Sequence, residues 1–223
     1  MIYVYAIVEG RPDLASGAAG LGGASLRALA QGEVAAVYSG DPPQGLEPTE
    51  DALWVHERVV EELMATRAVL PLRFGSTLAG EPELRDLLAA RHDEFSAALA
   101  SVRGRVELAV RASAPAAADG AEPAGGPAED GRAYLAAKLE RRRAAARMGD
   151  ELHAQLAPRA AASTFTATAE PRPAFSGAYL VDRARMEEFR RGFEEVRAAR
   201  PDLALACTGP WPPFSFTEPL EGS

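Results

Sequence analysis

Short apolar runs alternate with amphipathic stretches in the first half of the chain. Residues 2–8, IYVYAIV, are β-branched or aromatic and too few for a helix, so they predict a buried first strand. Residues 33–39 predict another strand, and 24–32 fit either a helical turn or a strand. A helix is expected from Thr49 or Glu50, because the apolar residues that follow recur at helical spacing: Val55, Val59, Val60, Leu63 and Met64.

A strand and a helix complete the first half. Residues 68–75, AVLPLRFG, predict a strand, and Pro71 inside it indicates an edge or irregular position because proline cannot donate a ladder hydrogen bond. Pro82 suits the first turn of the next helix. The apolar stripe of that helix consists of Leu84, Leu87, Leu88, Phe95, Leu99 and Val102. We expect these elements to form a first α+β unit.

The second half predicts a regular order of elements. A strand at 105–112, a helix from about 130 to 157, strands at 163–170 and 174–182, a helix at 183–200 and a strand at 203–208 follow one another. The expected apolar stripe of the long helix is Leu135, Leu139, Ala146, Leu152 and Leu156, and that of the second helix is Met186, Phe189, Phe193 and Val196. The βαββαβ order is the split βαβ pattern of ferredoxin-like folds, with both helices on one face of an antiparallel sheet.

The domain boundary does not coincide with the most flexible composition. Residues 113–128 are almost entirely Ala, Gly and Pro, which is typical of a linker. They fall between the first strand and first helix of the βαββαβ order, so we interpret them as a disordered loop inside that unit. The expected fold is therefore α+β in two domains, an N-terminal mixed α/β domain at 1–103 and a ferredoxin-like C-terminal domain at 104–223.

The stretch TGPWPPFSF, 208–216, follows the last strand. Its three prolines fix φ and lack backbone donors, so we expect an extended Pro/aromatic arm at 209–216 that does not continue the sheet. Trp211, Phe214 and Phe216 are its anchors. They either strap the arm across the interface between the domains or stay partly exposed for a partner.

Composition limits the classes of function. The net charge of −8 argues against bulk binding to nucleic acid. The single cysteine, Cys207, excludes an internal disulfide and a cysteine-based zinc site. The start of the chain lacks a signal-peptide pattern, and no run of apolar residues is long enough to span a membrane. A cytoplasmic protein is expected.

Catalytic motifs are weak. His56 begins HERVV like a zinc-protease helix, but Val60 stands where the second histidine belongs. HDE at 92–94 matches a fragment of the zinc deaminase motif without its cysteines. Cys207 lies in an apolar run and is expected to be a structural thiol, and the Gly-rich 17–25 is expected to be a loop. We expect no enzyme activity, no cofactor and no metal.

One basic cluster stands out. Lys138, Arg141, Arg142 and Arg143 lie within KLERRRAAAR, 138–147. No aromatic residue that could stack on bases lies in this segment, so a charged helix face that meets an acidic partner is favoured over a nucleic-acid surface. The acidic first half of the same protein is one candidate mate.

Four segments together resemble the GvpF/GvpL family of gas vesicle proteins. They are IYVYAIV, HERVVEEL with VLPLRFG, GRAYLAAK, and TGPWPPFSF, in that order over nearly the whole chain. Phe214 stands where the family often has Tyr, and the 113–128 insert looks peculiar to this chain. The resemblance implies a non-enzymatic accessory protein that binds the apolar shell protein GvpA, prevents its aggregation, joins other accessory proteins and in some members stays on the vesicle.

The candidate partner contacts are Arg73, Phe74, Trp211, Phe214 and Phe216. Arg73 is expected to be buried or half-buried beside an acid, or to contact a partner. The alternative function is a ligand-sensing regulatory protein, because βαββαβ units also form small-molecule-binding modules such as ACT domains.

Overall fold

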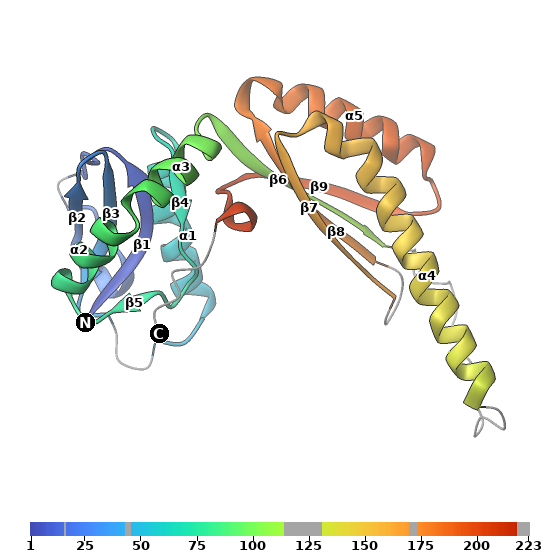
Figure 1. The fold of residues 1–223 in the computed structure, drawn as a ribbon, viewed down its shortest axis with the longest axis horizontal. Helices are drawn as coiled ribbons and strands as arrows, with labels where there is room; N and C mark the ends of the chain where they lie inside the picture. The colour runs from blue at the N-terminus through green and yellow to red at the C-terminus, as the bar shows by residue number, and fades with distance from the viewer. Residues whose placement is uncertain (16, 43–45, 114–130, 170–173, 218–223) are drawn as a thin grey trace. The chain divides into compact units, whose positions relative to one another are not determined.

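The run IYVYAIV forms the central strand of the first of two antiparallel sheets (Figure 1). The computed structural model describes residues 1–15, 17–42, 46–113, 131–169 and 174–217, with the backbone alone at 131–134. The chain divides into one unit of Met1–Glu107 with the segment from Trp211 onward, and a second unit of Leu108–Pro210. The expected boundary near 103 stays a prediction, and the insert at 113–128 lies outside the described residues after Ser113.

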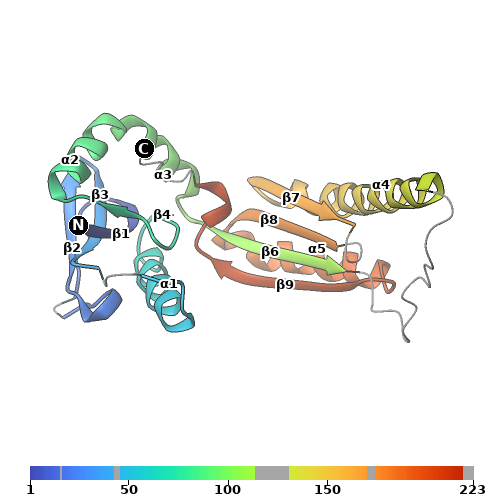
Figure 2. The same cartoon turned by 90° about the horizontal axis from the view of Figure 1, so that it is seen from below.

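The first unit has a sheet with helices on both faces (Figures 1 and 2). Its strand order is β2-β3-β1-β4, and β5 also pairs with β1. The strands are β1 (Ile2–Glu9), β2 (Leu26–Gln31), β3 (Val34–Gly40), β4 (Val69–Pro71) and β5 (Thr77–Leu78). Helix α1 (Glu50–Met64) covers one face, and α2 (Glu81–Ala90) with α3 (His92–Val102) covers the other. Because both faces are covered, the first seven residues of β1 are all buried.

Most elements of this unit agree with the sequence patterns. Thr49 caps α1, since its Oγ1 accepts a hydrogen bond from the Ala52 N–H at 3.3 Å. Pro71 ends an edge strand, as expected. The ambiguous stretch at 24–32 is a strand, β2. The single helix expected after Pro82 is wrong: the backbone leaves helical angles at Arg91, so α2 packs on β2 and β3 while α3 packs on β1 and β4.

The second unit has the strand order β7-β8-β6-β9, which places β8 between β6 and β7. Its elements are β6 (Arg105–Ser113), α4 (Gly131–Leu156), β7 (Ala162–Thr168), β8 (Ala174–Asp182), α5 (Met186–Ala199) and β9 (Ala204–Trp211). Helices α4 and α5 lie on the same face of this sheet (Figure 2). Its core contains Leu108, Leu152, Tyr179, Phe189 and Phe193.

Two expectations for this unit are wrong. Leu135, Leu139 and Ala146 of the predicted stripe are exposed, because α4 extends beyond the sheet and its buried side begins at Ala145 (Figure 1). The final strand also continues through Pro210 to Trp211. Proline is tolerated there because β9 is an edge strand, where one side of the backbone needs no ladder partner. The segment that follows is a 3₁₀ turn at Phe214–Phe216, not an extended arm.

Candidate functional site

A buried histidine organises the centre of the first unit. His56, on α1, is 2% exposed. Its Nδ1 lies 2.8 Å from the Tyr3 hydroxyl and its Nε2 lies 2.9 Å from the Leu72 carbonyl oxygen. Since a carbonyl can only accept, Nε2 carries the proton of the neutral ring and Nδ1 accepts from Tyr3. Burial lowers the pKa of His56, which favours this neutral form.

The same network fixes the loop after β4. The Tyr3 hydroxyl accepts a hydrogen bond from the Gly75 N–H at 3.1 Å, while His56 holds the Leu72 carbonyl. Gly75 has φ of +91°, a left-handed conformation that favours glycine. The Phe74 ring packs edge-on against His56 at 5.9 Å between ring centroids. Leu72–Gly75 is therefore held at both ends from inside the core.

The C-terminal turn is fastened to the same unit. Phe214 packs against the core, with its ring centroid 6.5 Å from that of His56. The backbone N–H and the hydroxyl of Ser215 both donate to the carboxylate of Glu107, each at 2.8 Å. The Thr217 hydroxyl donates to the Pro71 carbonyl oxygen at 3.3 Å. These contacts hold a short turn, rather than a free arm, against the first unit.

Glu107 is the buried acid that holds this turn. We call its two hydrogen bonds from Ser215 the latch. Glu107 is 7% exposed, and burial raises its pKa, an effect that the two hydrogen bonds from Ser215 oppose. Beside the turn, Phe216 and Thr217 line a groove of about 260 Å³ together with residues in or next to β1, β4 and α3: Ile7, Leu70, Leu72, Arg91, Glu94, Phe95 and Ala98. Sequence reasoning missed Glu107, because an acid within an alternating strand gives no sign of its partner.

The sequence-predicted contacts differ in accessibility. Arg73 is exposed, contrary to the expectation of a buried arginine, and it pairs with no acid among the described residues. Trp211 is 41% exposed. Phe74, Phe214 and Phe216 are half-buried. The structure brings Phe74 and Phe214 together around His56, and the role of all five as partner contacts stays a prediction.

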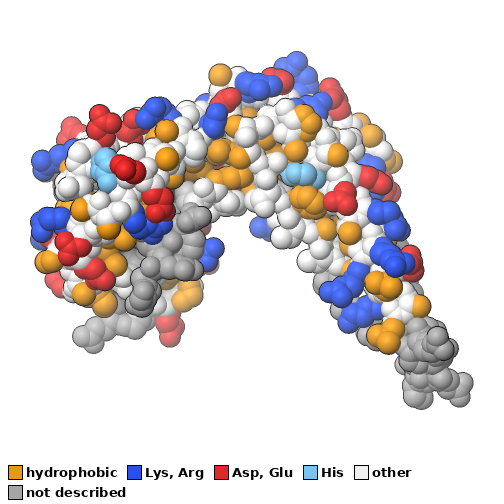
Figure 3. Space-filling model, viewed as in Figure 1, with side chains coloured by type: hydrophobic (Ala, Val, Ile, Leu, Met, Phe, Trp, Pro, Cys, Tyr) orange, Lys and Arg blue, Asp and Glu red, His pale blue; other side chains and the backbone are white. Residues whose placement is uncertain are grey.

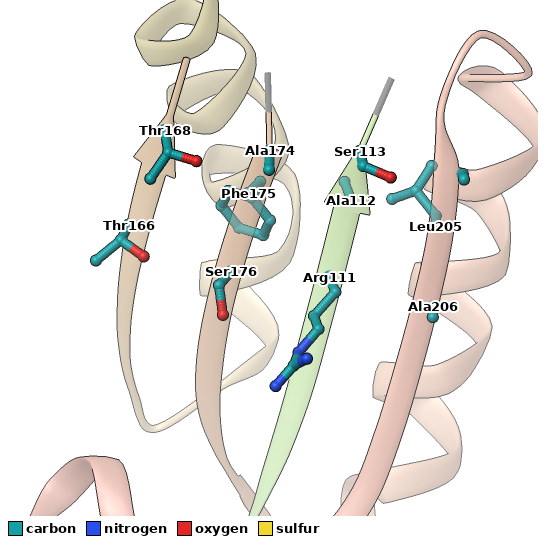
Figure 4. A pocket seen from close by; sticks show the side chains of 11 residues that line it. Arg111, Ala112, Ser113, Thr166, Thr168, Ala174, Phe175, Ser176, Leu205 and Ala206 are labelled. Carbon is teal, nitrogen blue, oxygen red and sulfur yellow. The ribbon is translucent and has the colours of Figure 1, made fainter. Parts of the chain in front are cut away.

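A second accessible feature lies in the other unit. Every second residue of β7 and β9 is exposed on the sheet face opposite α4 and α5. Most of these exposed side chains are small. A hollow of about 470 Å³ lies on this sheet (Figure 4), lined by Arg111, Ala112, Ser113, Thr166, Thr168, Ala174, Phe175, Ser176, Ala204, Leu205 and Ala206. Arg111 is the one ionisable residue of this lining. We call this surface the open sheet face.

The remaining candidates for catalysis stand apart. His153 Nδ1 and Nε2 lie 3.4 Å from the Tyr179 hydroxyl and the Ser163 Oγ, and its ring stacks on Phe165. Burial raises the pKa of the half-buried Cys207, which disfavours the nucleophilic thiolate. Within the described residues, no group of three or more His, Cys, Asp or Glu side chains is placed to hold a metal ion. No helix there is long and apolar enough to cross a membrane.

Residues 1–218 match the family model described as gas vesicle synthesis protein GvpL/GvpF. The chain belongs to the GvpL/GvpF family. It is 34% identical to gas vesicle protein L of Streptomyces sp. (strain CB03234) over 249 residues, which covers 96% of this chain and 91% of that protein. It is 26% identical to gas vesicle protein F2 of Halobacterium salinarum, covering 97% and 92% of the two chains.

Solved structures of other GvpL/GvpF members have the same fold. The crystal structure of GvpF from Microcystis aeruginosa superposes with a TM-score of 0.74 at 18% identity, covering 97% of this chain and 98% of that one. That of GvpF from Anabaena sp. PCC7120 gives 0.76 at 18% identity, covering 97% and 95%. At this identity the match shows the fold alone.

Three of the four segments that carry the family resemblance meet in the fold. Tyr3 comes from IYVYAIV, His56 from HERVVEEL, Phe74 from VLPLRFG and Phe214 from the C-terminal stretch, and all four meet in one aromatic cluster. The GRAYLAAK segment lies at the start of α4. Three of the four segments that carry the GvpF/GvpL resemblance therefore contribute to the core of the first unit.

Proposed function

We propose that this protein is a non-enzymatic accessory protein of gas vesicle assembly that binds the apolar shell protein GvpA and prevents its aggregation. It acts beside the growing vesicle in the cytoplasm together with other accessory proteins, and a fraction remains on the vesicle as a minor component. Membership of the GvpL/GvpF family supports a role in gas vesicle formation. We also propose that the second unit is a ferredoxin-like domain, on the basis of its strand order.

The open sheet face is the observation that carries this proposal. Its exposed positions include Thr164, Thr166, Ala204 and Ala206, whose small side chains allow another backbone to approach closely. Covering apolar surface stabilises a complex by about 25 cal/mol per Å². A shell subunit with an apolar face has such surface to cover, and a hollow whose lining contains one cation, Arg111, leaves few buried charges unpaired in the complex.

The neighbouring edge strand extends this surface. Strand β7 lies at the end of the sheet order and reads ASTFTAT, with neither a charge nor a proline. It pairs with β8 without a register shift from Ala162 to Thr168. Among the described residues no further strand pairs with the other edge of β7, and a free edge of this kind accepts an added strand. Arg73 and Trp211, the two accessible sequence-predicted contacts, are proposed as secondary contacts, with Phe74, Phe214 and Phe216 supporting them.

Co-expression with GvpA tests the proposal. We expect GvpA to co-purify with the wild-type protein and to shift from the pellet to the soluble fraction. Ala206→Glu places a charge on the open sheet face and is expected to abolish both effects. Ala198→Glu, the same change at an exposed position of α5, is the matched control and should behave as wild type. Failure of the wild-type protein to co-purify with GvpA or to change its solubility would count against the proposal.

The alternative is a ligand-sensing protein of ACT-like architecture. Arg111 at the hollow of the open sheet face is the observation that favours it, because a guanidinium binds carboxylates and phosphates. Thermal-shift screening with amino acids and nucleotides tests this alternative. A concentration-dependent rise in melting temperature that Arg111→Ala removes would support it, and no shift with either class would exclude these ligands.

A further inference from the structure

The outer half of α4 is a basic helix with two exposed leucines. Leu135 and Leu139 are 63% and 48% exposed, and their spacing of four residues places them on one side of the helix. The same stretch carries Lys138, Arg141, Arg142, Arg143 and Arg147. Figure 3 shows basic and apolar side chains side by side along α4. We call Leu135–Arg147 the basic arm.

Most side chains of the basic arm are exposed. Among residues 135–144, Lys138 is half-buried and all others are exposed. Its one acid, Glu140, already pairs with Arg143 at 2.8 Å. Exposed leucines on a helix that projects beyond its sheet are unfavourable in water, and an apolar strip flanked by arginines can be covered by a partner whose surface combines an apolar residue with acids.

The outer face of α1 has the complementary chemistry. Trp54 is 63% exposed, and the Arg58 guanidinium lies 5.6 Å from its ring centroid. Exposed acids surround it on the same helix: Glu50, Asp51, Glu57, Glu61 and Glu62. Of these, Glu62 pairs with Arg58 at 3.6 Å. We call Glu50–Glu62, with Trp54 at its centre, the acidic face.

We propose that the basic arm of one copy docks on the acidic face of a second copy of this chain. Trp54 packs against Leu135 and Leu139, and the arginines pair with the acids around it. Exposed tryptophan and arginine are the residues that dominate the energy of protein interfaces. Opposite charges on the two helices select this partner and speed its association, whereas the net charge of −8 disfavours nucleic acid.

The contact joins two different surfaces, so it is head-to-tail. Each copy that docks through its basic arm still presents its acidic face, and a third copy can therefore be added. The expected assembly is an open series of oligomers and not a closed symmetric dimer. This inference does not depend on binding of GvpA, and its test involves the purified chain alone.

Sedimentation velocity of two complementary variants tests this inference. Leu139→Glu with Arg143→Glu disables the basic arm, and Trp54→Ala with Glu57→Arg disables the acidic face. All four positions are on helix surfaces, so we expect both variants to fold as judged by circular dichroism. Each variant alone is expected to associate at least about thirtyfold more weakly than wild type.

Mixing the two variants gives the decisive result. Each retains one intact surface, so an equimolar mixture is expected to form a one-to-one complex and nothing larger. Wild type should form a concentration-dependent series that high salt dissociates, and Ala198→Glu should match it. A monomeric wild type, including one whose arginines bind heparin instead, would overturn the proposal. Oligomers that persist in both variants, or a mixture that stays monomeric, would overturn it equally.

Discussion

At the scale of single residues, His56 links three segments that are distant in sequence. It contacts Tyr3 in β1 and the Leu72 carbonyl after β4, and its ring faces Phe214. The zinc-protease spacing fails at His56, so the sequence argues against a metal site there, and the structure places this histidine in the core. The sequence could not identify its hydrogen-bond partners, which lie 53 and 16 residues away along the chain.

His56→Leu is expected to lower the free energy of unfolding by about 3 kcal/mol, because it leaves the Tyr3 hydroxyl and the Leu72 carbonyl without their buried partner. The wild-type protein should also lose stability as the pH falls below about 6.5, since the folded pKa of His56 is lowered and the unfolded chain binds the proton first. His56→Leu should lack this part of the pH dependence. Urea unfolding over a pH series measures both, and equal slopes in the two proteins would contradict the assignment.

Ser215→Ala tests the latch on Glu107. The variant loses one of two hydrogen bonds to a buried carboxylate, so we expect a loss of about 1.5 kcal/mol. The pKa of Glu107, already raised by burial, should rise further. The deficit is therefore largest where Glu107 is ionised and shrinks as the pH falls toward 4.5, the ordinary value for glutamate. Ser101→Ala, at an exposed serine, is the control; a deficit that grows toward low pH would refute the latch.

At the scale of elements, the helices and strands were largely predictable, while their ends and exposed sides were not. The short run of β-branched and aromatic residues identified β1, which is buried on both faces, and the period-3.6 patterns identified α1 and α5, which each have a full buried side. The stripe through Leu135 and Leu139 failed, because periodicity gives the side of a helix but not the point at which the sheet beneath it ends. The extension of β9 past Pro210 was missed for a related reason, since tolerance of proline depends on an edge position.

The two halves of α4 should differ sharply in sensitivity. Leu152 is fully buried, so Leu152→Ala is expected to lower the free energy of unfolding by about 3 kcal/mol. Leu139→Ala, at 48% exposure, should change the unfolding free energy of the monomer by less than about 0.5 kcal/mol. Chemical denaturation at low protein concentration compares them. Similar losses in both variants would mean that Leu139 is buried, as the apolar stripe predicted from the sequence implies.

At the scale of the whole molecule, the chain has the fold and family of GvpF and GvpL proteins. The candidate site was only partly predictable. Phe74, Trp211 and Phe214 were recognisable as aromatic residues beside glycine or proline. Phe216 was recognisable as the last ring of the Pro/aromatic stretch, and Arg73 as a cation in an apolar run. The open sheet face was not predicted, because Thr at every second position of 164–168 indicates a strand without showing that one of its sides is covered by no described helix.

Aggregation of purified GvpA after dilution from denaturant tests the central claim most directly. With an equimolar amount of the wild-type protein or of Ala198→Glu, light scattering by GvpA should be suppressed, while Ala206→Glu should leave it close to the level of GvpA alone. Unchanged scattering in the presence of the wild-type protein would contradict the account.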